Sequence, residues 1–170
     1  MLAAMPIIAP ILSNPLVDRR QSERAMLVRR GVQRLLGVMG VHALPEISLA
    51  SGRRADLVAL TRLGEVWIIE IKSSIEDFRV DRKWPEYRLF CDRLFFATHP
   101  GVPAEIFPDE CGFILSDGYG AEILREAPEH RLSAAVRKAM MLRLARAGAA
   151  RLLAAELAGY DLPPLDGESE

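Results

Sequence analysis

The chain has few of the residues that most often build metal or disulfide sites. Of its 170 residues, two are cysteine and three are histidine. Cys91 and Cys111 stand alone, with neither a CxxC spacing nor a histidine partner, so we expect buried reduced thiols, as in a cytoplasmic protein. His42, His99 and His130 are scattered and lack the spacing of a metal site or an acid/base pair, so we expect all three to be structural or exposed.

Long apolar runs and a strong net charge are also missing. The apolar start, MLAAMPIIAPIL, lacks a basic leader and is broken by Pro6 and Pro10, so it is too short for a membrane span and makes a poor signal peptide. We expect it to pack on the domain, on a protein partner or on a second copy of the chain. The net charge of −1 gives no general signal for nucleic acid. Basic residues outnumber acidic ones 13 to 9 in residues 1–85, and acidic residues lead 14 to 9 in residues 86–170, so any nucleic-acid surface must be local.

The composition that remains fits one domain. A chain of this length can bury a sizeable core without disulfides or a structural metal. Apolar residues make up 50% and charged residues 26%, which is ordinary for a globular protein. There is no internal repeat or linker. We therefore predict a single domain over residues 1–170, with a core at about 18–157, an N-terminal extension at 1–17 and a flexible, acid-rich tail at 162–170.

Two apolar runs of strand length enclose a short turn. They extend from Arg54 to Thr61 and from Glu65 to Lys72, and Arg62-Leu63-Gly64 joins them. A three-residue hairpin loop commonly ends in a left-handed residue, a conformation that glycine adopts at little cost. Gly64 stands at that place, so the pattern predicts a β-hairpin centred on Leu63.

This hairpin brings charged residues of the two strands together. Its register sets Asp56 opposite Glu70, with Cβ atoms about 5 Å apart. Lys72 shares the face of Glu70, about 6.6 Å further along the strand, and Arg54 lies opposite Lys72. Like charges opposed in this way repel each other unless a cation lies between them.

These residue types suit metal-dependent phosphodiester chemistry. Mg²⁺ or Mn²⁺ takes oxygen ligands, which Asp56, Glu70 and the carbonyl of Ile71 could supply. A bound cation polarises a phosphoryl oxygen and acidifies a water, and Lys72 could orient that water or balance charge. The alternative is that Glu70 and Lys72 form a surface ion pair worth at most about 1 kcal/mol.

The pattern strand–Asp–hairpin–Glu-x-Lys resembles the core of the PD-(D/E)XK nuclease superfamily. The string EIKSSIEDFRVDRKWPEYRLFCDRLFFAT, residues 70–98, resembles more specifically the MmcB-type bacterial DNA repair proteins, a branch of that superfamily. The resemblance implies that Asp56 and Glu70 are metal ligands, that Lys72 is the catalytic lysine and that Glu23 is an acidic residue beside the site. Ala55 replaces the proline of the motif's name.

The remaining elements follow from caps, breakers and periodicity. They are a helix from Asp18 to about Gly37, an edge strand from Val41 to Ala50 interrupted at Pro45, an irregular or partly helical segment from Ser73 to Lys83, a helix from Pro85 to about Cys91, a strand from Arg93 to Thr98, a hairpin of Cys111 to Leu115 and Ala121 to Arg125 over Asp117-Gly118, and a helix from Arg131 to Leu157. The order αβββαβββα predicts an α/β fold with a restriction-endonuclease-like mixed sheet flanked by helices.

Several residues near the motif are candidate contacts to DNA. Arg53 and Arg54 stand at the mouth of the hairpin, close to the expected metal. Ser73 follows the lysine directly and could bond a phosphate, or it could cap the next turn. Lys83 precedes a helix start and could contact phosphate or be solvated.

Four further residues have competing interpretations. Glu23 could instead pair with neighbouring arginines of its helix. Asp77 and Asp81 lie near the site but could equally be helix-surface charge. Trp84 is better read as a core residue than as a base-stacking one.

The residues thus indicate a Mg²⁺- or Mn²⁺-dependent nuclease that acts on DNA, with no membrane role, and the resemblance implies that it acts in DNA repair. A catalytically inactive nuclease-fold protein that binds DNA or a protein partner is the alternative.

Overall fold

The computed structural model describes residues 22–161, which are built around a six-stranded mixed sheet with strand order β1-β2-β3-β4-β5-β6. The strands are β1 (His42–Ser48), β2 (Arg54–Leu60), β3 (Val66–Ile71), β4 (Arg93–Thr98), β5 (Gly112–Ser116) and β6 (Ala121–Arg125). The pairs β1–β2, β2–β3 and β5–β6 are antiparallel, whereas β3–β4 and β4–β5 are parallel. The predicted mixed α/β fold is therefore confirmed. The predicted N-terminal extension at 1–17 and the predicted tail at 162–170 lie outside the described residues.

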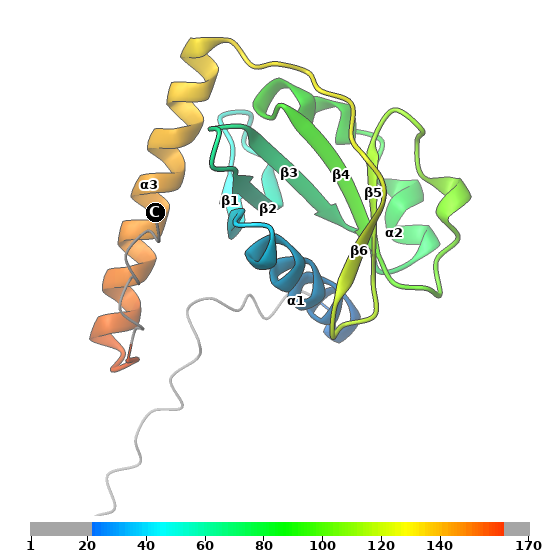
Figure 1. Cartoon of the computed structure of the whole chain (residues 1–170), viewed down its shortest axis with the longest axis horizontal. Helices are drawn as coiled ribbons and strands as arrows, with labels where there is room; N and C mark the ends of the chain where they lie inside the picture. Colours follow the sequence, from blue (N-terminus) through cyan, green and yellow to red (C-terminus); the bar gives the residue numbers. More distant parts are fainter. Residues whose placement is uncertain (1–21, 162–170) are drawn as a thin grey trace, which may run out of the picture.

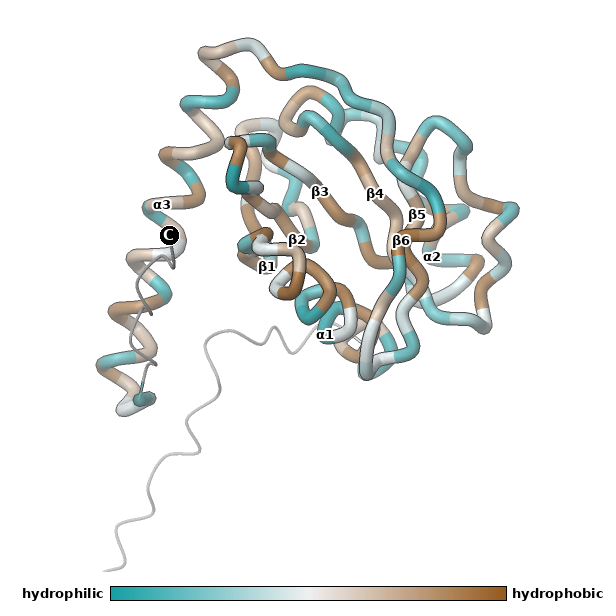
Figure 2. The backbone as a smooth tube through the Cα atoms, viewed as in Figure 1, coloured by the Kyte–Doolittle hydropathy of each residue, from teal (hydrophilic) through white to brown (hydrophobic). Residues whose placement is uncertain are grey.

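Helix α1 (Glu23–Val38) covers one face of the sheet (Figure 1). Its buried residues Val28, Val32 and Leu36 pack in one apolar cluster with residues of the central strands, among them Ile69 and Phe95. Figure 2 shows the apolar residues gathered along the inner strands and the hydrophilic ones in the loops. The helix begins later than predicted, because the Ser22 hydroxyl accepts the Ala25 N–H at 3.2 Å and acts as the N-cap. Asp18, the predicted cap, lies outside the described residues.

The other face carries a second apolar cluster and the remaining helices. These are α2 (Ile75–Val80), the 3₁₀ helices η1 (Trp84–Phe90) and η2 (Ala104–Ile106), and α3 (Ala134–Leu157). Pro85 stands in the first turn of η1, as predicted, although the helix is 3₁₀ rather than α. Phe96 at the centre contacts Phe78 of α2, Trp84 of η1 and Phe107, with ring centroids 5.3, 5.6 and 5.4 Å away. Trp84 thus packs against the core, as predicted, although it is only partly buried.

Strand β1 is an edge strand, as Pro45 predicted, and α3 runs beside it (Figure 1). Glu46 has a positive φ of 54°, and the regular pairing with β2 is interrupted at this residue. Arg151 of α3 donates to the carbonyl oxygens of Pro45 and Glu46, and Arg143 donates to that of Ser48 at 2.7 Å. Arginine side chains of α3 thus occupy carbonyl groups of the sheet edge that would otherwise face water.

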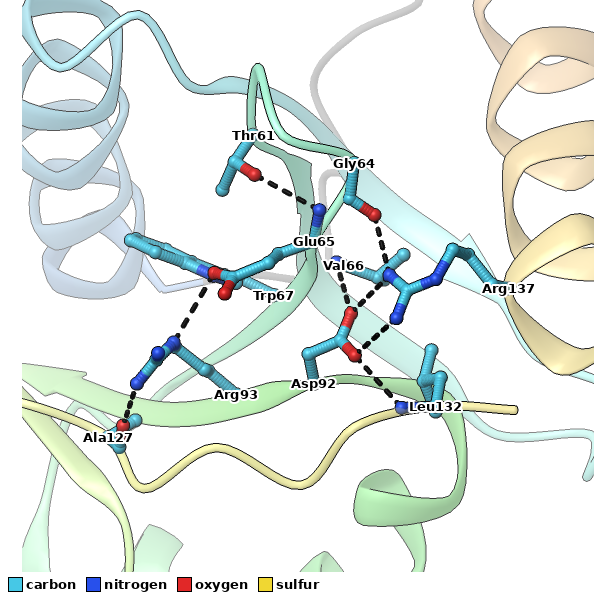
Figure 3. A network of polar contacts seen from close by, with 10 residues as sticks. All are labelled: Thr61, Gly64, Glu65, Val66, Trp67, Asp92, Arg93, Ala127, Leu132 and Arg137. Atoms are coloured by element: carbon cyan, nitrogen blue, oxygen red, sulfur yellow. Dashed lines mark hydrogen bonds and ion pairs between the residues drawn. The ribbon is translucent and has the colours of Figure 1, made fainter. Parts of the chain in front are cut away.

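The start of α3 is tied to the sheet through Asp92, which is fully buried (Figure 3). Its carboxylate accepts the N–H groups of Val66 and Leu132 at 2.7 and 2.9 Å. The guanidinium of Arg137 donates to both carboxylate oxygens at 2.7 and 2.8 Å. This one side chain therefore joins the beginnings of β3, β4 and α3. Among residues 22–161, no helix has both the length and the apolar character needed to cross a bilayer.

Candidate active site

The hairpin of β2 and β3 has the predicted register. Leu57 pairs with Ile69 and Leu60 with Val66, and the N–H of Thr61 donates to the carbonyl of Glu65 at 3.0 Å. Gly64 has a φ of 80°, the left-handed conformation that a three-residue loop requires at this position. Because side chains alternate along a strand, a slip of one residue would have moved the whole motif to the opposite face.

The regular pairing ends at Leu57 and Ile69, and continuing its register sets Asp56 against Glu70. Two hydrogen bonds from backbone N–H groups to the carboxylates hold the two residues next to each other. The backbone N–H of Asp56 donates to Glu70 Oε1 at 3.1 Å, and the N–H of Ile71 donates to Asp56 Oδ2 at 2.8 Å. Glu70 is 3% exposed. Asp56 is half-buried, so the strand geometry holds a buried and a half-buried carboxylate next to each other.

This placement makes ionisation of both acids unfavourable. Burial and then the nearby charge of Asp56 raise the pKa of Glu70 well above its usual value, against the opposing effect of Lys72. Burial likewise raises the pKa of Asp56, although the hydrogen bond from Ile71 works in the other direction. A cation between the carboxylates would relieve both effects.

The donor set fits a hard divalent cation. Asp56, Glu70 and Ile71 all line one cavity of about 640 Å³, and carboxylate and carbonyl oxygens are the ligands that Mg²⁺ and Mn²⁺ prefer. Between residues 22 and 161 there is no group of three or more His, Cys, Asp or Glu side chains arranged to hold a metal. Any further ligands would therefore be backbone carbonyls, waters or substrate phosphate, as is common for Mg²⁺.

Lys72 lies in the same cavity, but it points to an acid that the motif does not include. Its Nζ is 2.7 Å from Asp81 Oδ2, at the C-terminal cap of α2. Burial opposes the ammonium form, yet the hydrogen bond that Lys72 donates to Asp81 and the charges of Glu70, Asp81 and Asp56 outweigh it and raise the pKa of Lys72. The lysine is therefore a cation at neutral pH.

Three of the four predicted DNA contacts lie at the cavity. Arg53, Arg54 and Ser73 line it. Arg53 Nε is 2.8 Å from Glu86 Oε2, and Arg54 is 3.7 Å from Glu46 Oε1.

Lys83, the fourth predicted DNA contact, is exposed and does not line this cavity. Its backbone N–H donates to Asp81 Oδ1 at 3.3 Å. Ser74, not Ser73, caps α2, because its hydroxyl accepts the N–H of Asp77 at 3.1 Å. The Ser73 hydroxyl donates to the Asp77 carboxylate at 3.3 Å.

The expected position of Glu23 beside the site needs correction. Glu23 is exposed and lines a separate surface hollow with Met26, Leu27 and Arg30. Ser22 and Ala25 are the residues of this helix that line the cavity. The prediction located the correct helix end but not the side of the helix that faces the carboxylates.

Two residues that the motif does not include belong to the cavity wall. Tyr87 is 4% exposed, and its hydroxyl donates to the carbonyl of Arg54 at 3.2 Å, so it supports the strand end next to Asp56. Asp81 holds Lys72, as described above. The spacing of four between Asp77 and Asp81 was the available sequence signal, but it is equally typical of a solvated helix face.

A mixed sheet flanked by helices, with facing carboxylates and a lysine on one hairpin, defines a nuclease-like α/β fold. The chain belongs to the MmcB-like family of DNA repair proteins, because the family model described as "DNA repair protein MmcB-like" matches residues 12–159. It is also similar to a solved structure, the SPO1766 protein of unknown function from Silicibacter pomeroyi, at 39% identity and a TM-score of 0.76. That match covers 85% of this chain and 99% of the other. A search of curated proteins finds no match.

Proposed function

We propose that this member of a DNA repair family is a metal-dependent nuclease that hydrolyses DNA phosphodiester bonds. The observation that supports the proposal most is the pair of a buried Glu70 and a half-buried Asp56, adjacent across the hairpin in a cavity that also contains Lys72. Two ionised carboxylates held together at this burial would be costly without a counter-ion. An arrangement of this kind is typical of a site built for a cation.

Each residue of the cavity has a part in the proposed reaction. Asp56 and Glu70, with the carbonyl of Ile71, would hold Mg²⁺ or Mn²⁺, which supplies Lewis acidity at phosphorus and lowers the pKa of a bound water. Lys72 contributes a fixed positive charge that can balance the negative charge developing on the phosphoryl oxygens.

Residues at the rim of the cavity would position the DNA. The Arg53 and Arg54 side chains lie where a phosphodiester backbone would approach, and Ser73 offers a hydroxyl. Arg53 is already oriented, since its guanidinium lies 5.7 Å from the centre of the Tyr87 ring and is paired with Glu86.

A second function, DNA binding without cleavage, has its own supporting observation. Both carboxylates already accept backbone N–H groups, and the Lys72 ammonium is paired with Asp81. The cavity is therefore internally satisfied, as in a nuclease fold retained for binding alone. On this alternative, DNA affinity survives Glu70→Ala and no divalent cation is needed.

One experiment separates the two functions. The pure full-length protein is incubated with single-stranded, duplex, flapped and branched DNA in Mg²⁺ or Mn²⁺, beside Glu70→Ala and Lys72→Ala. Lys138→Ala, an exposed lysine of α3 that does not line the cavity, is the matched control.

The nuclease proposal expects cleavage by the wild type and by Lys138→Ala, and loss of cleavage in both motif variants. Equal cleavage by every protein would assign the activity to a contaminant. DNA binding without cleavage by any protein would favour the second function.

A further inference from the structure

The contact between Lys72 and Asp81 links the proposed catalytic hairpin to a helix outside the motif. The ammonium of Lys72 lies 2.7 Å from Asp81 Oδ2, and the two side chains are 7% and 16% exposed. In contrast, Asp56 and Glu70 accept hydrogen bonds from backbone N–H groups of the opposite strand. The lysine is therefore turned toward α2 and not toward the two acids of its own hairpin.

Asp81 is held in place by its surroundings. While one carboxylate oxygen binds Lys72, the other accepts the N–H of Lys83 at 3.3 Å. The helix that carries it is docked by Phe78, whose ring lies 5.3 Å from that of Phe96 and 4.9 Å from that of Phe107. The position of Asp81 thus depends on the aromatic core of this face of the sheet.

Without Asp81, the Lys72 ammonium could bind the carboxylates of its own hairpin instead. Lys72 is two residues beyond Glu70 on the same face, about 7 Å along the strand, within reach of a flexible four-carbon side chain. Glu70 is buried beside Asp56, so an ammonium would be attracted strongly to the pair. An ammonium and a divalent cation would then compete for the same carboxylate oxygens.

We propose that Asp81 is a positioning residue that holds the Lys72 ammonium away from Asp56 and Glu70, which keeps both carboxylates open to a divalent cation. The inference rests on the proposed metal site, and it adds to that site a residue outside the hairpin. It gives a reason for a third, half-buried acid next to a motif that already has two. It also gives α2 a role in the cavity besides forming its wall.

The test measures Mn²⁺ affinity directly, from the electron paramagnetic resonance signal of free Mn²⁺, and DNA cleavage separately. Asp81→Asn is expected to weaken Mn²⁺ binding by about tenfold or more, in the range typical for residues that orient ligands of a metal. Asp81→Ala serves as a second variant, and circular dichroism melting confirms that each variant is folded.

Two controls isolate the role of the ion pair. Glu76→Gln removes the same charge from the same helix and from the wall of the same cavity, without touching Lys72. It is expected to weaken Mn²⁺ binding much less than Asp81→Asn. In a Lys72→Met background, Asp81→Asn should have no larger effect than Glu76→Gln, because there is no ammonium left to redirect.

The outcomes separate this inference from the proposed function. Equal losses in Asp81→Asn and Glu76→Gln, or an undiminished effect of Asp81→Asn in the Lys72→Met background, would overturn the role of Asp81 even if the wild type cleaves DNA. Mn²⁺ binding by a wild type that does not cleave would remove the nuclease proposal, while the affinity ratios still decide the role of Asp81. Failure of the wild type to bind Mn²⁺ would also overturn the proposed role of Asp81.

Discussion

The backbone N–H of Asp56 donates to the carboxylate of Glu70 at 3.1 Å, across the antiparallel pair of β2 and β3. One residue along, the N–H of Ile71 donates back to the carboxylate of Asp56 at 2.8 Å. Each acid is thus fixed by the backbone of the opposite strand rather than by another side chain. The arrangement places two acidic groups close together, which makes it unfavourable to ionise both. Two of the predictions below depend on that cost.

Glu70→Gln is expected to stabilise the metal-free protein at pH 8 by about 1 kcal/mol, a melting temperature rise of about 2–4 °C. Glutamine keeps an acceptor for the Asp56 N–H but removes the buried charge. Burial and Asp56 raise the pKa of Glu70 in the folded state. The wild type therefore loses stability as the pH rises through that raised pKa, because Glu70 must then ionise in the folded protein. The advantage of the variant should therefore vanish below about pH 4. Calorimetry in EDTA over this pH range checks it, and a variant less stable than wild type at pH 8 would contradict it.

Divalent cations are expected to raise the melting temperature of the wild type. A ligand that binds only the folded state at a hundred times its dissociation constant stabilises by about 2.7 kcal/mol, or several degrees for a chain of this size. Glu70→Gln should lose most of that gain, whereas Asp109→Asn, which alters an exposed surface acid paired with Arg125, should retain it. Thermal melts with and without Mn²⁺ measure the difference, and equal shifts in all three proteins would place the binding elsewhere.

Arg137→Met is expected to destabilise the protein by about 3 kcal/mol or more, because it leaves the buried carboxylate of Asp92 without its cation. Arg146→Met, at an exposed position of the same helix, should change stability by no more than about 0.5 kcal/mol. Urea unfolding measures both values. Equal, small effects would mean that the Asp92 network does not anchor α3.

The same network predicts how stability depends on acid. Burial opposes ionisation of Asp92, but the hydrogen bonds from Arg137, Leu132 and Val66 outweigh it, so its pKa is lowered. A lowered pKa contributes stability that is present above the ordinary carboxyl pKa of 3.8 and is lost as the pH falls through the lowered value. Wild type should therefore lose stability below about pH 4, and Arg137→Met should lose less over the same interval. Parallel losses in both proteins would argue against this assignment.

Two glycines of α1 should respond in opposite directions to the same substitution. A Cβ at Gly31 would collide with Ser116 Oγ and the Gly120 carbonyl oxygen, so Gly31→Ala should destabilise by about 1–3 kcal/mol. Gly37 has open space around it, so Gly37→Ala should stabilise by about 0.5–1 kcal/mol through helix propensity. Urea unfolding of the two variants tests the prediction, and a gain in both would show that α1 does not pack closely on the β5–β6 turn.

Sequence reasoning succeeded where the physical cause is local. The loop Arg62-Leu63-Gly64 allows few hairpin geometries, and the two-residue period of a strand then sets Asp56 opposite Glu70. Pro45 marked the edge strand, since proline cannot donate to a sheet ladder. The register of the motif and the face it occupies were therefore determined by residues a few positions apart.

The tertiary structure alone decided which other residues join the motif. Whether Glu23 or Ser22 and Ala25 face the cavity depends on how α1 is rotated on the sheet, which its packing against strands far along the chain determines. Whether Asp81 meets Lys72 depends on how Phe78 docks against Phe96 and Phe107. These contacts join segments that are far apart in the sequence, whereas hydrophobic periodicity describes each segment separately. The amino-acid sequence by itself determined a pair of opposed acids with a lysine nearby, and long-range packing determined what that lysine touches.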